Sequence, residues 1–256
     1  MNIDLHIHTT ASDGSLPPTQ VVQEARQAGL RVISVADHDT TSGVPEALGA
    51  GDAHGVIVVP GVEISASHPS GEAHILGYWV DHDDPAFQAF LERPRSTRAP
   101  RIVEMCKRLR GLGLEVRAEE VFEEAGGKEA VGRPHLARVM LAKGYVKDME
   151  EAFRCYLTQG APAYVKRIKN STAETIAAIH RCGGISVIAH PGLLEDPGLV
   201  ESLIREGVMG IEVLCHEHDS AAAERYSEMA DRNGLLKTGD SDYHGDMLGK
   251  SFRLGD

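Results

Sequence analysis

The feature that most constrains this chain is a pair of histidines in its opening fifteen residues, MNIDLHIHTTASDGS. Apolar and polar residues alternate from Ile3 to His8 with the two-residue period of a β-strand, so His6 and His8 leave the same face. Asp13 follows in a Ser-Asp-Gly turn, from which a loop can return a carboxylate toward both imidazoles. These donor types hold divalent metal ions, and the pattern favours a metal site over a strand whose histidines are merely hydrogen-bonded.

Length and composition are those of a globular protein. A chain of 256 residues is long enough for one large domain with a small insertion. Its net charge of -12 argues against a nucleic-acid binder that works through a broad basic surface, so we expect no stable DNA binding. The same charge makes a bound cation an effective means of holding an anionic substrate.

Cysteine spacing and hydropathy indicate a cytoplasmic protein. The cysteines lie far apart without the CxxC spacing of a zinc knuckle, and no disulfide framework is suggested. The N-terminus lacks the basic and apolar regions of a signal peptide, and no apolar run approaches the roughly 20 residues that span a bilayer. We therefore expect reduced thiols and no membrane association, whereas the oligomeric state is not predicted. The cysteines are Cys106, Cys155, Cys182 and Cys215.

Strand-like and helix-like segments alternate along most of the chain, a pattern that favours an α/β fold with a parallel sheet or barrel. About seven strands are expected, near 3–7, 31–37, 56–65, 72–80, 185–190, 209–215 and 235–244. The helices expected between them lie near 17–28, 43–54, 172–181, 197–206 and 219–233.

The middle of the chain has a different texture. Charged helical segments follow one another with no convincing strand between them, which predicts a small all-helical insertion. The expected domains are therefore a barrel from 1–84 and 165–256, and a helical insertion from 85–164 over the active-site rim. Within the insertion, helices are expected near 101–112, 118–125, 134–143 and 148–159.

Metal-capable residues recur at or just after the expected strands. In βα barrels functional side chains gather at the carboxyl ends of the strands, so these residues are expected to converge. Nine nitrogen and oxygen donors exceed what one catalytic zinc uses, which favours two or three divalent ions. Because no cysteine is among them, manganese, iron or zinc is favoured over a thiolate centre. The candidate ligands are His6, His8, Asp13, His38, Glu63, His74, His190, Asp242 and His244.

The motifs that contain these residues resemble a known family. They are DLHIHT, ADHDT, PGVEIS, HILGY, AHP and GDSDYHG, in this order from the first expected strand to the last. Together they resemble the PHP family, the polymerase and histidinol phosphatase domains, which are amidohydrolase-like. The resemblance implies a distorted (β/α)7 barrel with a trinuclear metal centre, in which Mn²⁺ is the expected ion and iron or zinc the alternatives.

Within that family the chain is most similar to small phosphoesterases that remove the 3′-phosphate of 3′,5′-nucleotide bisphosphates, with related activity on short 5′-phosphorylated RNA. Asp13, the helical insertion and the segment VGRPHLARVML carry this narrower resemblance. It implies a small nucleotide such as adenosine 3′,5′-bisphosphate as substrate, converted to AMP and phosphate.

The resemblance also implies how the ligands divide among three ions. Asp240 stands where many members have a glycine, and we expect it to hydrogen-bond near the ligands, with an exposed carboxylate as the alternative. The implied sets are His6, His8, Glu63 and Asp242 for one ion, a bridging Glu63 with His74 and His190 for the second, and Asp13, His38 and His244 for the third.

Arg133 and His135 are candidate substrate contacts and catalytic residues beside Asp13 and His38. Arg133 would donate its planar fork to phosphate, and His135 would be a second donor or the acid that protonates the leaving oxygen. The alternative for this segment is a helix start, with Pro134 in the first turn and Arg133 solvated.

Weaker candidates lie around these sites. Lys166 and Arg167 provide either a second phosphate contact or a solvated basic patch. Ser12 either caps the turn that carries Asp13 or touches phosphate, and capping is favoured. His216 and His218 weakly suggest substrate contact from a rim loop.

Three other functions compete with the nucleotide phosphatase. A histidinol-phosphate phosphatase is disfavoured by Asp13, which replaces the histidine usual in those enzymes, and a cyclic phosphodiesterase on the same barrel stays open. A non-catalytic metal-binding module is disfavoured because none of the nine ligand positions is lost.

Overall fold

The structure is a computed structural model that describes residues 2–128, 131–245 and 254–255. The chain divides into two compact units, one built from Met1–Glu92 with Lys169–Asp256 and the other from Arg93–Ile168. The boundaries expected from the sequence, at 84 and 165, differ by several residues. The helix α3 (Pro85–Arg95) begins in the first unit and ends in the second.

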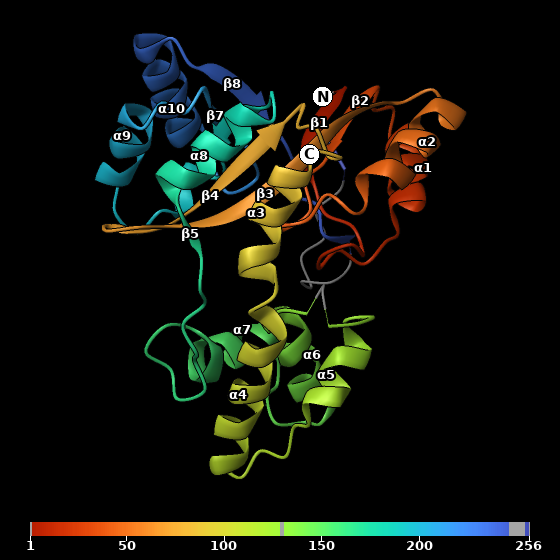
Figure 1. The fold of residues 1–256 in the computed structure, drawn as a ribbon, viewed down its shortest axis with the longest axis vertical. Helices are drawn as coiled ribbons and strands as arrows, with labels where there is room; N and C mark the ends of the chain where they lie inside the picture. Colours follow the sequence, from red (N-terminus) through yellow and green to blue (C-terminus); the bar gives the residue numbers. More distant parts are fainter. Residues whose placement is uncertain (1, 129–130, 246–253, 256) are drawn as a thin grey trace. The chain divides into compact units, whose positions relative to one another are not determined.

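The first unit contains a mixed sheet with helices, so the α/β class is confirmed (Figure 1). Neighbouring strands run parallel except around β4, which is antiparallel to both β3 and β6. The short strand β5 (Asn170–Ser171) pairs with β3 outside the main order. The main order is β1 (Ile3–Ile7), β2 (Val32–Val35), β3 (Ile57–His68), β4 (Gly71–Tyr78), β6 (Ile185–Ile188), β7 (Gly210–Leu214) and β8 (Leu236–Gly239).

The antiparallel strand β4 departs from the parallel sheet expected from the sequence. Strand β3 runs on to His68, and only two residues separate it from Gly71 at the start of β4. A parallel connection needs a crossover of a dozen or more residues, whereas a two-residue loop returns the chain as a hairpin. The hairpin places His74 of β4 opposite Ser65, two residues beyond Glu63 on β3.

The two ends of the strand order meet through the segment that follows β8. The amide of His8 donates to the carbonyl of Tyr243 at 2.9 Å, and the amide of Tyr243 donates to the carbonyl of His6 at 3.3 Å. This pairing supports the (β/α)7 barrel, which stays a prediction. The last strand was expected to reach 244 but ends at Gly239, and Asp242, at φ 47°, interrupts the extended path beyond it.

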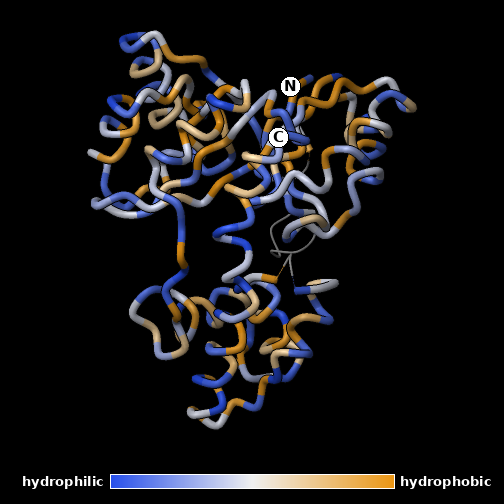
Figure 2. Tube along the Cα trace, viewed as in Figure 1, coloured by the Kyte–Doolittle hydropathy of each residue, from blue (hydrophilic) through white to orange (hydrophobic). Residues whose placement is uncertain are grey.

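Helices cover the sheet because each has one apolar face. One apolar cluster joins α1 and α2 to the strands β1, β2 and β3, and a second joins α8, α9 and α10 to β3, β4, β6 and β7. Figure 2 shows hydrophobic segments along the strands. None of the helices in the described part of the chain has the length and hydropathy to cross a membrane. The bounds are α1 (Pro18–Gln27), α2 (Val44–His54), α8 (Thr172–Arg181), α9 (Gly198–Arg205) and α10 (Ser220–Asn233).

The second unit is helical and has an apolar core of its own, in which Ile102, Met105 and Leu136 are buried. Its helices begin and end within three residues of the expected positions, but α3 was not predicted from the sequence. Pro94 near its end weakens the helical pattern, while Asp84 begins the helix by accepting a hydrogen bond from the amide of Ala86 at 2.7 Å. The helices are α4 (Arg98–Gly111), α5 (Ala118–Glu124), α6 (Arg133–Ala142) and α7 (Met149–Ala152), which a π-helix continues over Phe153–Leu157.

Candidate metal centre

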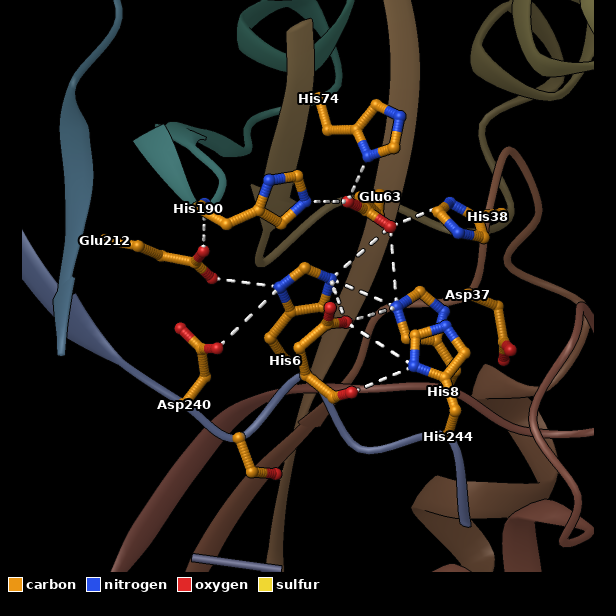
Figure 3. A network of polar contacts seen from close by, with 12 residues as sticks. His6, His8, Asp37, His38, Glu63, His74, His190, Glu212, Asp240 and His244 are labelled. Atoms are coloured by element: carbon orange, nitrogen blue, oxygen red, sulfur yellow. Dashed lines mark hydrogen bonds and ion pairs between the residues drawn. The ribbon is translucent and has the colours of Figure 1, made fainter. Parts of the chain in front are cut away.

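Glu63 of β3 lies at the centre of a group of imidazoles (Figure 3). Its Oε1 atom is 2.7 Å from Nδ1 of His74 and 3.0 Å from Nε2 of His190. Its Oε2 atom is 2.7 Å from Nδ1 of His38 and 3.4 Å from Nε2 of His6. These side chains come from four different parts of the sheet, so the fold gathers them around one buried carboxylate.

The position of His38 follows from the backbone next to it. The amide of Asp39 donates to the carbonyl of Glu63 at 2.8 Å, and the amide of Glu63 donates to the carbonyl of Asp37 at 3.1 Å. These two hydrogen bonds pair the loop after β2 with the central strand β3. His38 is therefore held beside Glu63 by sheet pairing and not by its own side chain alone.

The ring nitrogens of His6 and His8 are as far apart as two ligand atoms of one metal ion. Their Nε2 atoms are 3.1 Å apart, and Oε2 of Glu63 is 3.4 Å from each of them. Oδ1 of Asp242 is 3.5 Å from the first nitrogen and 3.2 Å from the second. Donor atoms about 2.1 Å from a tetrahedral ion stand about 3.4 Å apart, so these four groups fit one cation.

A second donor group surrounds Asp13. Its Oδ1 atom is 3.8 Å from Nδ1 of His8 and 3.6 Å from Nε2 of His244, and its Oδ2 atom is 3.7 Å from Nε2 of His38. Nδ1 of His8 is buried and makes no hydrogen bond within the described residues. A buried nitrogen without a partner is costly unless a ligand completes it, so this donor set also fits a metal ion.

Three non-glycine residues at this site adopt positive φ angles: Asp39 at 56°, His190 at 27° and Asp242 at 47°. Such conformations cost on the order of 1–3 kcal/mol each and persist where the surrounding structure imposes them. Each of the three follows a strand and turns the chain sharply there. The strained backbone thus lies at two candidate ligands, His190 and Asp242, and at Asp39, which follows the candidate ligand His38.

The electrostatics keep the central carboxylate, Glu63, ionised. Burial alone would raise the pKa of Glu63, but His38, His74 and His6 lower that pKa well below its usual value. Burial, with His244 and His38 nearby, lowers the pKa of His8 to about 3. Glu63 and Asp13 instead raise the pKa of His38 to about 9, so the cluster holds protonated as well as neutral imidazoles, and a bound divalent cation would displace those protons.

Two buried acidic residues beside His6 extend the cluster. Oε1 of Glu212 accepts a hydrogen bond from Nδ1 of His6 at 3.0 Å, and Oε2 of Glu212 accepts one from the amide of His190. Asp240 is 2% exposed, with Oδ1 at 4.0 Å from Nδ1 of His6, so the exposed alternative for Asp240 is wrong. Sequence analysis did not single out Glu212, although an acidic residue between Ile211 and Val213 in a buried strand was a usable signal.

Asp37 organises the turn that carries Asp13. Its Oδ1 atom accepts hydrogen bonds from the amide of Thr9 at 2.8 Å and from the hydroxyl of Ser12 at 2.6 Å, and its Oδ2 atom accepts one from the hydroxyl of Thr9 at 2.8 Å. The hydroxyl oxygen of Ser12 also lies 3.3 Å from Oδ1 of Asp13. This geometry supports the turn-capping interpretation of Ser12, and substrate contact by Ser12 stays a prediction.

Arg133 and His135 lie at the start of α6 in the helical unit. Nη1 of Arg133 donates to the carbonyl of Leu157 at 3.2 Å, and its guanidinium carbon is 5.6 Å from the ring centre of Phe153. Nδ1 of His135, which is buried, accepts from the amide of Gly132 at 3.1 Å. The helix start expected as the alternative is present, and substrate contact by these residues stays a prediction.

Lys166 is exposed, and its role as a phosphate contact also stays a prediction. The ring of His218 accepts from the amide of Gly192 and donates to the carbonyl of Val213, each at 3.0 Å, and substrate contact by His218 stays a prediction. The two hydrogen bonds link the loops that follow β6 and β7. Nε2 of His216 lies 2.9 Å from Glu217.

The known proteins most similar in sequence to this chain include enzymes that act on nucleotides or RNA. A family model described as PHP domain matches residues 4–116. Over 249 residues, 95% of this chain, the sequence is 36% identical to a 3′,5′-nucleoside bisphosphate phosphatase from Chromobacterium violaceum and covers 87% of that protein. It is 38% identical over 188 residues, 73% of this chain, to a 5′-3′ exoribonuclease from Haemophilus influenzae, of which it covers 68%.

A solved structure has the same fold across nearly the whole chain. It is that of a candidate metal-dependent phosphoesterase from Bifidobacterium adolescentis, and it superposes with a TM-score of 0.91 at 32% sequence identity. The match covers 99% of this chain and 91% of that one. The helical unit is therefore shared with that protein as well as the sheet.

Proposed function

This chain belongs to the PHP domain family, and from that membership we propose that it is a metal-dependent phosphoric monoester hydrolase that removes the 3′-phosphate of 3′,5′-nucleoside bisphosphates. One observation carries the proposal: half-buried histidine nitrogens converge around the buried carboxylate of Glu63 in a chain 36% identical over 95% of its length to a phosphatase with that substrate. Adenosine 3′,5′-bisphosphate, converted to AMP and phosphate, is the substrate we expect.

The proposed centre holds two or three divalent ions, with Mn²⁺ the expected ion and iron or zinc the alternatives. The donor distances support the three sets that the family resemblance implies, and they add that His8 and His38 each face two sets. The sets are His6, His8, Glu63 and Asp242; Glu63, His74 and His190; and Asp13, His38 and His244.

The reaction needs a nucleophile, neutralised phosphoryl oxygens and a proton for the leaving oxygen. Divalent ions bound here supply an activated water and charge neutralisation. In our proposal Arg133 donates its two parallel N–H groups to phosphoryl oxygens, and Lys166 contacts the second phosphate. Because Nδ1 of His135 accepts from the amide of Gly132, its Nε2 carries the proton and donates a hydrogen bond to the leaving 3′-oxygen, which takes its proton from water.

Short 5′-phosphorylated RNA is the second candidate substrate. The exoribonuclease from H. influenzae, 38% identical over 73% of this chain, supports it. Both substrates place a phosphoester beside a second phosphate on a ribose, so one metal centre serves either. The net charge of -12 favours the smaller substrate, because a long polyanion would be repelled.

A substrate panel tests the proposal. Purified protein loaded with Mn²⁺ is given adenosine 3′,5′-bisphosphate, a 5′-phosphorylated oligoribonucleotide, a cyclic phosphodiester and histidinol phosphate, and phosphate release and products are measured. We expect AMP and phosphate from the bisphosphate. His38→Asn is the matched inactive control, expected to fold but to turn over far less. Release confined to histidinol phosphate, or metal-loaded protein that hydrolyses no phosphoester, contradicts the proposal.

A further inference from the structure

Glu212 of β7 joins two residues of the candidate metal centre that come from two other strands. It is fully buried, and its two carboxylate oxygens have different partners. Oε1 accepts a hydrogen bond from the side chain of His6, and Oε2 accepts one from the backbone amide of His190, just beyond β6. His6 lies on β1, which stands at the opposite end of the strand order from β7 and β8. Figure 3 shows Glu212 on one side of His6 and Glu63 on the other.

The bond to His6 determines which ring nitrogen can bind a metal ion. A carboxylate only accepts hydrogen bonds, so Nδ1 of His6 carries a proton and Nε2 is the nitrogen whose lone pair is left for a metal ion. That lone pair faces Oε2 of Glu63 at 3.4 Å and Nε2 of His8 at 3.1 Å. Asp240 lies 4.0 Å from the same Nδ1, beyond hydrogen-bond distance, so Glu212 makes this contact.

The bond to His190 holds a strained turn. His190 has φ 27° and ψ 60°, a conformation that non-glycine residues rarely adopt. Its amide donates to Glu212, and in this conformation its Nε2 lies 3.0 Å from Oε1 of Glu63. Without an acceptor at this point the amide would be buried and unpaired, and the turn would relax toward a more common conformation.

We propose that Glu212 is a positioning residue that orients His6 and His190 toward the metal ions by binding Nδ1 of His6 and the backbone amide of His190. This inference rests on the metal centre of the proposed function. It assigns a role to a residue outside all three ligand sets. Carboxylates that accept from metal-binding histidines typically change metal affinity by about 10- to 100-fold when they are removed.

The test compares Glu212→Gln and Glu212→Ala with Asp4→Asn. Asp4 is an equally buried carboxylate whose two oxygens accept from the amide and hydroxyl of Ser241 and from the backbone amides of Gly255 and His6, but not from a histidine ring. Glutamine has one acceptor atom, so it can serve His6 or His190 but not both. Mn²⁺ affinity is measured by competition with a chelator, with metal alone as the probe.

We expect both Glu212 variants to lose about 10- to 100-fold in Mn²⁺ affinity. Asp4→Asn is expected to lose stability in urea while its Mn²⁺ affinity stays near that of the unmodified chain. Nitrogen NMR of the protein loaded with diamagnetic Zn²⁺ gives an independent readout: in the unmodified chain Nδ1 of His6 carries the proton and Nε2 is the metal-binding nitrogen, and in Glu212→Ala the two nitrogens exchange these roles in part of the molecules. Glu212→Asp keeps the charge and is expected to be intermediate.

The outcomes separate this inference from the proposed function. Glu212 variants that bind Mn²⁺ as tightly as the unmodified chain, or that lose no more than Asp4→Asn does, overturn the positioning role. If Glu212→Gln does not fold, Glu212→Asp decides on the same criterion. An unmodified chain that binds Mn²⁺ but releases no phosphate overturns the proposed function alone, and a chain that binds neither Mn²⁺, Fe²⁺ nor Zn²⁺ overturns both.

Discussion

Asp37 and His38 are adjacent residues with different tasks. His38 faces Glu63 and Asp13, whereas the carboxylate of Asp37 turns away and accepts hydrogen bonds from Thr9 and Ser12. Asp37 thereby fixes the turn from which Asp13 reaches the cluster. Two neighbouring positions thus fix both a candidate ligand, His38, and the loop of another, Asp13, which couples the donor group around Asp13 to a hydrogen-bond network.

Replacing Asp37 with Asn should loosen this turn. The amide keeps one acceptor oxygen but places a donor where the hydroxyl of Thr9 now donates, so we expect a loss of about 1–3 kcal/mol in the free energy of unfolding. Metal bound per chain should fall as well. Urea titration and metal analysis measure the two effects. Ser12→Ala, which removes one of the three hydrogen bonds, should cost less, and an Asp37→Asn protein as stable as the unmodified chain contradicts this role.

Arg133→Ala tests the proposed phosphate contact. If Arg133 binds phosphate equally in the ground state and the transition state, KM rises while kcat is unchanged, and if it acts mainly in the transition state, kcat falls. Steady-state kinetics with adenosine 3′,5′-bisphosphate distinguish the two. Arg133→Lys is the control, since it keeps a charge but not the planar fork. An unchanged kcat/KM would remove Arg133 from the site.

At the level of elements, the positions of the strands could be predicted from the sequence better than their parallel or antiparallel direction. Strands β2, β6 and β7 stand out as runs of branched apolar residues, and the motif residues follow them as the βα pattern requires. The reversal of β4 escaped prediction because apolar alternation is the same for a parallel and an antiparallel strand. Only the two-residue connection from His68 to Gly71 encodes it.

The site shows the same limit. The nine candidate ligands were identified from motifs, but Glu212 and Asp37 were not, because their partners depend on sheet register. Glu212 lies 206 residues from His6, and no local pattern records that contact. Likewise Asp240 was placed near the ligands from a single unusual position, and its burial beside His6 depends on long-range contacts that no local pattern records.

Helix α5 offers a prediction with a defined pH dependence. Glu120 accepts from the amide of Arg117 at 2.9 Å and lies 2.9 Å from Nζ of Lys143, and these partners lower its pKa from 4.5 to about 2. Because the folded-state pKa is depressed, the stabilisation is fully present above about pH 4.5 and is lost as pH falls through about 2.

Glu120→Gln should therefore lower the melting temperature slightly at pH 7 and have little effect near pH 2. The change is small because the pair is on the surface and is screened by salt. Thermal unfolding followed by circular dichroism at several pH values measures it. Glu119→Gln, on the same turn, is the control, and an equal effect at both pH values would contradict the assigned cause.

On the scale of the whole molecule, the metal centre connects most of the sheet. Its donors come from β1, β3 and β4 and from the segments that follow β2, β6 and β8. A ligand that binds only this assembled arrangement stabilises the folded state by mass action, by about 2.7 kcal/mol at a concentration 100 times its Kd. Metal and fold are thus linked thermodynamically.

Removing metal should lower the melting temperature of the protein. We expect a chelator to lower the melting temperature and added Mn²⁺ to restore it. The difference between the two melting temperatures should grow with the Mn²⁺ concentration. Differential scanning calorimetry measures the shift. His38→Asn, which removes one ligand of the set with Asp13 and His244, should show a smaller shift, and a melting temperature indifferent to metal would contradict the proposed centre.

The pairing of Ile7 with Tyr243 also has a consequence for synthesis. A chain made from its N-terminus presents His6 and His8 long before Asp242 and His244 exist, because the ribosome adds only about 5–20 residues per second. Contacts between residues so distant in sequence form late in folding. The nascent chain therefore passes through a period in which His6 and His8 lack Asp242 and His244, and the full donor set exists only after residue 244 has been added.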